Sequence, residues 1–247
     1  MSEHIKVSLY NNVQHIQICR LDKKNALTGA MYGAMAEALE TSNTNEDINV
    51  NLIYGEPGCF TAGNDIKDFM HTAQTGDLDN SVVTFLVSLA KLEKPLILAI
   101  DGPAIGIGTT MAFHADLVYA SSNGVFATPF VDLGLVPEAA SSYLMPQRMG
   151  YAKAYEMLAL GHPFSAEQAK ESGFVNQILD DNLMEHCQQT AETLALKPQK
   201  ALKITKRLMK GADKTIVEKT MQEEIEHFKN QLTSQEAKTA FFAFLNK

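Results

Sequence analysis

Two glycine-rich segments constrain the fold more than any other feature of this chain. Residues 59–67 read CFTAGNDIK and residues 101–110 read DGPAIGIGTT, and each comes where an apolar strand pattern ends and a helical pattern begins. Glycine lets backbone segments approach one another closely, and the first N–H groups of a helix have no acceptor within that helix. The chain therefore has to run from strands into helices through tight turns, as α/β proteins do.

The hydrophobic pattern around these segments also predicts an α/β fold. Four strands are predicted from alternation or from short apolar runs, at residues 13–18, 48–54, 95–100 and 117–120. After the first strand, Thr28 has the position of a helix N-cap, and Met31, Met35 and Leu39 recur on one helical face. Another helix is predicted over about residues 108–115. Strand, helix and strand in repetition predict right-handed βαβ units around a largely parallel sheet.

The pattern becomes mostly helical after about residue 149. Helices are predicted at residues 151–160, 165–172, 182–194, 198–210, 214–231 and 234–244. Ser165 with Gln168 and Ser234 with Ala237 have the spacing of N-caps and their third helical residues. A helical tail of this length beside an α/β core favours packing against another subunit. The apolar run at residues 240–245 either makes that contact or packs into the chain's own core, and both hypotheses stay open.

Composition excludes several classes of function. The chain has 247 residues, 45% of them hydrophobic, which suits one large domain or a domain with a helical appendage. Its net charge of -8 argues against a broad basic face for nucleic acid. The 3 cysteines form no CxxC or His/Cys cluster, so we expect no metal site and a reducing compartment. No signal pattern or membrane-length apolar run occurs, so we expect no membrane partner and a cytoplasmic location.

The glycine segments also suggest chemistry. Ile107 lies between Gly106 and Gly108 at the start of a predicted helix, so its N–H should point out of the turn. Asn64, after Gly63, offers a second backbone N–H. Two such donors aimed at one point form an oxyanion hole, which stabilises a carbonyl oxygen as it becomes an enolate. The alternative is a pair of packing turns. The segment at residues 101–110 is not a Walker loop, and it lacks the third glycine of a dinucleotide fingerprint.

Taken together and in this order, the motifs resemble the crotonase (enoyl-CoA hydratase/isomerase) superfamily. The matching segments are RLDKKNAL at 20–27, FTAGNDIK at 60–67, KPLILAIDGPAIGIG at 94–108, HADLVYAS at 114–121 and FATPFVDLG at 126–134. The resemblance covers roughly the whole chain. It implies an α/β spiral of ββα units, with residues 1–195 forming the core and its acyl-CoA site. It further implies that residues 196–247 form a helical region that builds a homotrimer or hexamer.

The resemblance also implies which residues bind an acyl-CoA thioester, the expected substrate. The backbone N–H groups of Asn64 and Ile107 would form the oxyanion hole. Coenzyme A is part of the substrate, so no separate cofactor is expected. The residues implied in binding are Lys23, Lys24, Ala62, Gly63, Asp65, Ile66, Lys67, Gly106, Gly108 and Phe130. The three lysines would lie near the phosphates; the alternative for each is an ordinary solvated side chain.

The carboxylates indicate which reaction follows. Hydratases of the family use two glutamates, at positions that hold Thr110 and Phe130 here, and neither side chain can act as a base. Glu138 occupies the slot of the catalytic glutamate in peroxisomal-type Δ3,Δ2-enoyl-CoA isomerases, whereas Asp132 is assigned a structural role. We therefore expect isomerisation of 3-enoyl-CoA to 2-trans-enoyl-CoA. Another crotonase reaction, such as hydration or thioester hydrolysis, and a non-catalytic acyl-CoA-binding role stay open.

Overall fold

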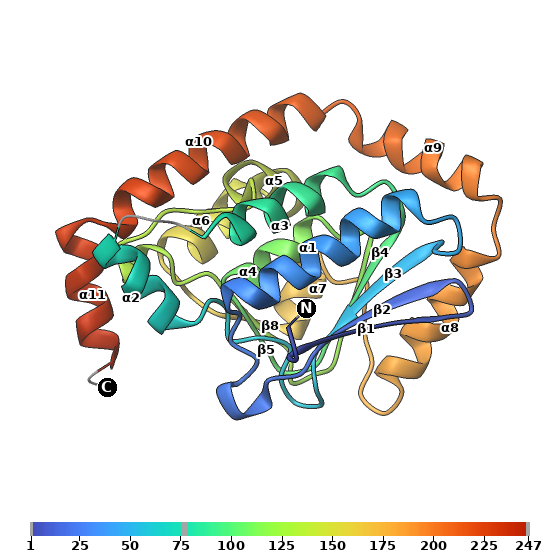
Figure 1. Ribbon diagram of the computed structural model, residues 1–247, viewed down its shortest axis with the longest axis horizontal. Helices are drawn as coiled ribbons and strands as arrows, with labels where there is room; N and C mark the ends of the chain where they lie inside the picture. The colour runs from blue at the N-terminus through green and yellow to red at the C-terminus, as the bar shows by residue number, and fades with distance from the viewer. Residues whose placement is uncertain (1, 76–78, 246–247) are drawn as a thin grey trace.

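The fold is built on two sheets. The structure is a computed structural model that describes residues 2–75 and 79–245 (Figure 1). The six-stranded sheet has the order β1-β2-β3-β4-β6-β9, with β1 (Ile5–Tyr10), β2 (Val13–Ile18), β3 (Val50–Tyr54), β4 (Leu96–Ile100), β6 (Leu117–Ala120) and β9 (Gln177–Ile178). The three-stranded sheet has the order β5-β7-β8, with β5 (Pro103–Ile105), β7 (Val125–Ala127) and β8 (Phe164–Ser165). In the larger sheet β1 pairs antiparallel with β2, and the remaining pairs are parallel.

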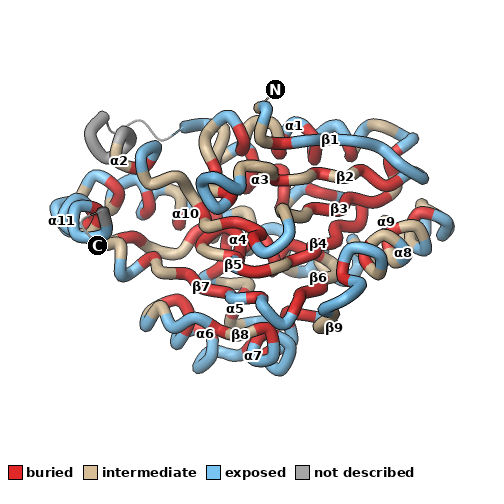
Figure 2. The backbone as a smooth tube through the Cα atoms, turned by 90° about the horizontal axis from the view of Figure 1, so that it is seen from below, coloured by how far each residue is buried: buried red, intermediate tan, exposed pale blue. Residues whose placement is uncertain are grey.

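The central strands of the larger sheet are buried on both faces. One face packs against α1 (Gly29–Thr44) and α3 (Asn80–Lys91), and the other packs against α8 (Leu183–Ala195). Successive residues of β4 alternate between these cores: Leu98 faces the first, while Ile97 and Ala99 face the second. Strands covered on both sides by helices read as continuous apolar runs, which is why residues 95–100 show no alternation. Figure 2 shows the central strands as buried tube between more exposed helices.

The remaining helices surround this core. They are α2 (Ile66–Thr75), α4 (Ile107–Thr110), α5 (Ser141–Met149), α6 (Tyr151–Ala159), α7 (Ala166–Glu171), α9 (Gln199–Lys210), α10 (Lys214–Leu232) and α11 (Gln235–Leu245). In Figure 1, α9 and α10 arch over the side of the molecule that carries α3 and α5. α10 contacts α2, α3, α5 and α11. No described helix is long and apolar enough to cross a membrane.

Most predicted elements are present, with differences at their ends. The capping box at Ser165 has both of its hydrogen bonds, and Ser234 accepts a hydrogen bond from the Ala237 N–H at 3.1 Å. Thr28 does precede α1, but its side chain makes no cap hydrogen bond. The helix predicted over residues 108–115 was wrong in extent, because α4 ends at Thr110 and a 3-10 turn follows over Met111–Phe113. The chain has only a few residues there before it must enter β6.

The apolar run at residues 240–245 divides between core and surface. Phe241 is buried, and its ring lies 6.0 Å from that of Phe69. Phe242 and Phe244 are 71% and 52% exposed. Intramolecular packing therefore accounts for Phe241, while the rings of Phe242 and Phe244 remain largely open to solvent.

Candidate active site

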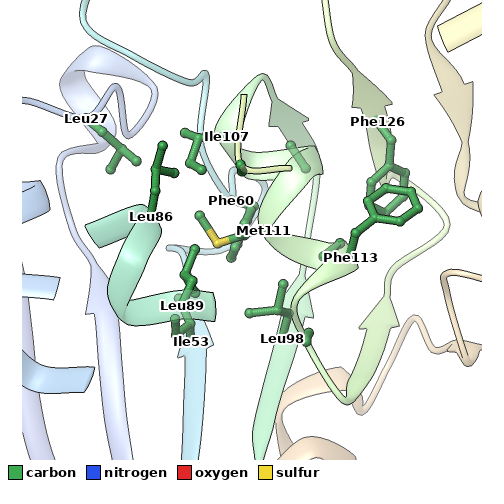
Figure 3. Close-up of a cluster of buried hydrophobic side chains, with 14 of the residues drawn as sticks. Leu27, Ile53, Phe60, Leu86, Leu89, Leu98, Ile107, Met111, Phe113 and Phe126 are labelled. Carbon is green, nitrogen blue, oxygen red and sulfur yellow. The ribbon is translucent and has the colours of Figure 1, made fainter. Parts of the chain in front are cut away.

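The two glycine turns lie side by side. Thr61 and Ala104 form a parallel bridge, in which the Thr61 N–H donates to Pro103 O at 2.9 Å. Asn64 and Ile107 each come three residues after this bridge. Because parallel neighbours run in step about 4.8 Å apart, their backbones leave the bridge at the same end. Figure 3 shows Ile107 in the same buried core as Phe60 and Met111.

Glycine is required for this close approach. Gly63 has φ +86°, and a Cβ there would lie 2.9 Å from the carbonyl oxygen of Ile105 in the second turn. A Cβ at Gly108 would lie 2.6 Å from the Cγ2 atom of Thr61 in the first turn. A side chain at either position would force the two turns apart.

The turns leave two backbone donors available. Among the described residues, no acceptor is found for the backbone N–H of Asn64 or of Ile107. Their neighbours are paired: the Asp65 N–H donates to Leu27 O at 2.9 Å, and the Gly106 N–H donates to Ala127 O at 2.8 Å. Ile107 is the first residue of α4, where N–H groups lack intrahelical acceptors. This arrangement can bind one developing oxyanion.

Glu138 lies close to these donors. Its carboxyl group is buried, and its Oε1 atom accepts a hydrogen bond from Thr110 Oγ1 at 2.5 Å. Thr110 is the last residue of α4, one turn after Ile107, a rise of about 4.5 Å along the helix. Sequence reasoning missed this donor role of Thr110. No local signal could have found it, because Glu138 lies 28 residues away in the sequence.

The surroundings of Glu138 favour its neutral form. Burial raises the pKa of Glu138 to about 8, the hydrogen bond from Thr110 opposes this rise, and the charge of Glu224 adds to it. A carboxyl group with a pKa near the working pH can both accept and return a proton. Phe130, which is buried beside the turn at Gly106, supplies apolar surface there.

Tyr32 is a second residue of the site that sequence reasoning missed. Its hydroxyl donates a hydrogen bond to Asn64 Oδ1 at 2.6 Å. Burial raises the pKa of Tyr32 well above its usual value, and the charge of Glu138 adds to this effect. The Asn64 side chain is thereby held by α1, which fixes the turn that carries the Asn64 N–H.

The residues predicted to hold coenzyme A lie around the first turn. The Ala62 N–H donates to Lys24 O at 2.9 Å, which brings the exposed Lys23 and Lys24 beside that turn. The Asp65 carboxylate is used in contacts within the chain: it forms an ion pair with Arg20 Nη1 at 2.7 Å and accepts the Lys67 N–H at 2.9 Å. Ile66 and the exposed Lys67 begin α2. Contact of any of these side chains with a phosphate stays a prediction.

Cavity size does not identify the site. The cavity beside Asn64 and Tyr32 has a volume of about 20 Å³. A cavity of about 640 Å³ lies between α3, α5, α9 and α10, and none of the predicted site residues lines it. We therefore place the site by its donors and its carboxylate. Within the described residues, no group of three or more His, Cys, Asp or Glu side chains could hold a metal ion.

The chain is similar to known proteins over nearly its whole length. The enoyl-CoA hydratase/isomerase family model matches residues 8–247. Rat enoyl-CoA delta isomerase 2 is 31% identical over 100% of this chain, which spans 64% of that protein's length, less than two thirds. The 1,2-epoxyphenylacetyl-CoA isomerase of Escherichia coli is 32% identical, with 100% of this chain and 97% of that protein covered. The solved structure of Pseudomonas aeruginosa OdaA superimposes with a TM-score of 0.95, at 40% identity and with both chains fully covered.

Proposed function

Because the chain belongs to the enoyl-CoA hydratase/isomerase family, whose crotonase-type reactions act on acyl-CoA thioesters, we propose that it isomerises 3-enoyl-CoA to 2-trans-enoyl-CoA. One observation carries this proposal: the buried carboxyl group of Glu138 accepts a hydrogen bond from Thr110, on the short helix that begins at the donor Ile107. The rat relative, which is named as an enoyl-CoA delta isomerase, supports this choice of reaction.

The reaction needs one base and two backbone donors. The N–H groups of Asn64 and Ile107 bind the thioester oxygen and make the C2 protons more acidic. Glu138 takes one C2 proton, the electrons spread over a dienolate, and the carboxylic acid then returns the proton to C4. The double bond moves from C3–C4 to C2–C3 without net gain or loss of atoms. Each donor contributes about 3 kcal/mol to transition-state stabilisation, and the base contributes roughly a hundred- to ten-thousand-fold in rate.

The residues at the two hydratase positions support a single-base reaction. Thr110 occupies one of these positions. It provides no second carboxylate there, and its hydroxyl donates a hydrogen bond to the base, Glu138. Phe130 is buried and apolar, so it cannot hold a water molecule for addition to a double bond. Both features favour moving a double bond over hydrating it.

The same proposal covers the coenzyme A part of the substrate and the division of the chain into two regions. The adenine end of coenzyme A lies along Ala62, Asp65 and Ile66, and its phosphates lie near Lys23, Lys24 and Lys67. Residues 1–195 form the catalytic core, and residues 196–247 form the region that assembles the oligomer.

The test is an assay of 3-enoyl-CoA esters of several chain lengths, followed by the ultraviolet absorbance of the conjugated product. The Glu138→Gln variant should lose about a hundred- to ten-thousand-fold in kcat. Asp132→Asn, an exposed acid six residues earlier, is the matched control and should retain activity. Near wild-type turnover by Glu138→Gln would remove this residue from the mechanism. Formation of 3-hydroxyacyl-CoA from 2-enoyl-CoA at enzymatic rates would indicate a hydratase instead.

A further inference from the structure

A second buried carboxylate, Glu224, reaches the active-site loop from α10. Both of its oxygens are used: Oε2 accepts the Ala140 N–H at 2.5 Å, and Oε1 accepts the Ser142 N–H at 2.9 Å. Its partners are 84 and 82 residues away in the sequence, and Glu224 itself is only 6% exposed. A carboxylate is rarely buried in this way unless it is paired or fully hydrogen-bonded.

The backbone that Glu224 holds is strained. Ala139 and Ala140, which directly follow Glu138, have φ of 60° and 54°, in the left-handed region. This conformation is unfavourable for a residue with a Cβ atom, and it persists where surrounding contacts enforce it. The enforcing contacts are those of Glu224 and a hydrogen bond of 2.7 Å between His114 Nε2 and Ala139 O.

Glu224 also completes the start of α5. Ala140 occupies the N-cap position and makes no side-chain cap, so the first N–H groups of α5 need another acceptor. Glu224 supplies it for Ser142, and its negative charge lies at the positive end of the helix. The acceptor that a neighbouring Ser, Thr or Asp usually provides at an N-cap is provided here by a residue of a distant helix.

We propose that Glu224 is a positioning residue, which holds the strained Ala139–Ala140 turn and thereby aims Glu138 at the substrate carbon. Helix α10, from the last quarter of the sequence, then supports the active site of its own chain. The inference rests on the proposed function only in naming Glu138 as the base. Two other carboxyl groups interact electrostatically with Glu224. The charge of Glu224 raises the pKa of Glu138 in the loop, and the charge of Glu223, on the same helix, raises the pKa of Glu224.

The primary test compares Glu224→Gln with Glu226→Gln. Glutamine can accept one of the two N–H groups but presents an amide donor to the other, and it removes the charge near Glu138. Because misplacement of about 1 Å can cost a hundred-fold in rate, we expect kcat to fall at least about ten-fold with little change in KM. The midpoint of the pH profile of kcat/KM should move to lower pH. Glu226 is exposed on the same helix, so Glu226→Gln makes the same charge change and should leave kcat and the midpoint unaltered.

A rescue variant separates positioning from general stability. Glycine adopts φ near 54° without a Cβ penalty, so Ala140→Gly should reduce the dependence of the turn on Glu224. The fold-loss in kcat caused by Glu224→Gln should be smaller in the Ala140→Gly background. If Glu224→Gln alone fails to fold, the double variant is compared with Ala140→Gly instead: faster exchange of the Ser142 amide in the double variant supports the inference, and equal exchange contradicts it.

Amide exchange provides a readout that does not depend on the reaction. The Ala140 and Ser142 amides should be protected in the wild type and should exchange faster in Glu224→Gln, whichever thioester the enzyme turns over. This outcome distinguishes failure of the inference from failure of the isomerase proposal. Unchanged exchange, or a folded Glu224→Gln with the kcat and pH midpoint of Glu226→Gln, would overturn the assignment.

Discussion

At the scale of the residue, the raised pKa of Glu138 predicts a pH-dependent rate. Burial raises this pKa to about 8, and only the ionised carboxylate can take the C2 proton. Since the profile of kcat/KM reports the free enzyme, activity should rise with pH and level off above a midpoint near 8. Measurements between about pH 6 and 10 test this, and a flat profile over that range would contradict the assignment of Glu138 as the base.

The same shift predicts an effect on stability. The pKa of Glu138 is about 8 in the folded chain, compared with an ordinary value of 4.5, so between these values the folded state binds more protons than the unfolded state. The contribution of Glu138 is therefore fully present below about pH 4.5 and is lost as the pH rises through 8. Glu138→Gln cannot ionise and should be more stable than the wild type at pH 8.5, by at least about 1 kcal/mol. Urea unfolding at pH 5 and 8.5 measures this, and a wild-type advantage at the higher pH would contradict it.

Thr110 tunes the base directly, because its hydroxyl hydrogen bond to Glu138 favours the ionised form. Thr110→Val keeps the shape of the side chain and removes the donor. We expect the midpoint of the pH profile to move upward and kcat/KM at pH 7 to fall about ten-fold, the effect of one pKa unit. Thr110→Ser keeps the hydroxyl and is the matched control. Equal profiles for the two variants would show that the hydrogen bond does not act on the base.

At the scale of the element, the need for close contact between the two glycine turns can be tested with a substitution that forces them apart. Gly108→Ala places a Cβ 2.6 Å from Thr61 Cγ2, so α4 must move away from the first turn and the two donors no longer meet at one point. Loss of one oxyanion donor costs about a hundred-fold in kcat.

Thr61→Ser provides the rescue of Gly108→Ala. Serine removes the clashing methyl group but keeps the hydroxyl, which donates to Asn25 O at 2.7 Å and accepts the Gly63 N–H at 3.1 Å. The double variant should recover most of the lost activity. Gly33→Ala lies within α1, where the nearest atom is Ser81 Oγ at 3.5 Å, so it serves as a glycine control that should leave kcat unchanged. Lack of rescue would argue against a steric origin.

The same scale explains what the sequence could and could not predict. The strands at residues 95–100 and 117–120 were placed within a residue or so, because apolar runs and neighbouring Pro and Asp are local signals. Asn64 and Ile107 could also be proposed as backbone donors from the sequence, because the glycines that point to them are their immediate neighbours in the chain. The partners that shape the site are distant: Thr110 lies 28 residues from Glu138, and Tyr32 lies 32 from Asn64. Contacts of this kind follow from the packing of helices, and no local pattern encodes them.

At the scale of the whole molecule, contacts within the single chain do not account for the exposed apolar residues of α9. None of its residues is buried, although Ile204 and Leu208 lie four apart on one face. Leu208 and the neighbouring Met209 are 74% and 78% exposed. An amphipathic helix gains most of its stability from packing of its apolar face, so α9 needs a partner surface. A second copy of this chain, in a homotrimer or hexamer, is the expected partner.

This expectation can be tested by charging the exposed face of α9. Light scattering of the wild type should give three or six times the mass of one chain, and Leu208→Glu with Met209→Glu should lower that number, because burying two carboxylates costs more than the apolar contact returns. Leu9→Glu is the matched control: Leu9 is also exposed, at 48%, but lies on the edge strand β1, and its substitution should leave the mass unchanged. Because α9 joins α8 to α10, which holds Glu224 against the active-site loop, dissociation should also lower kcat. A monomeric wild type with full activity would show instead that α10 holds the loop without help from a neighbouring chain.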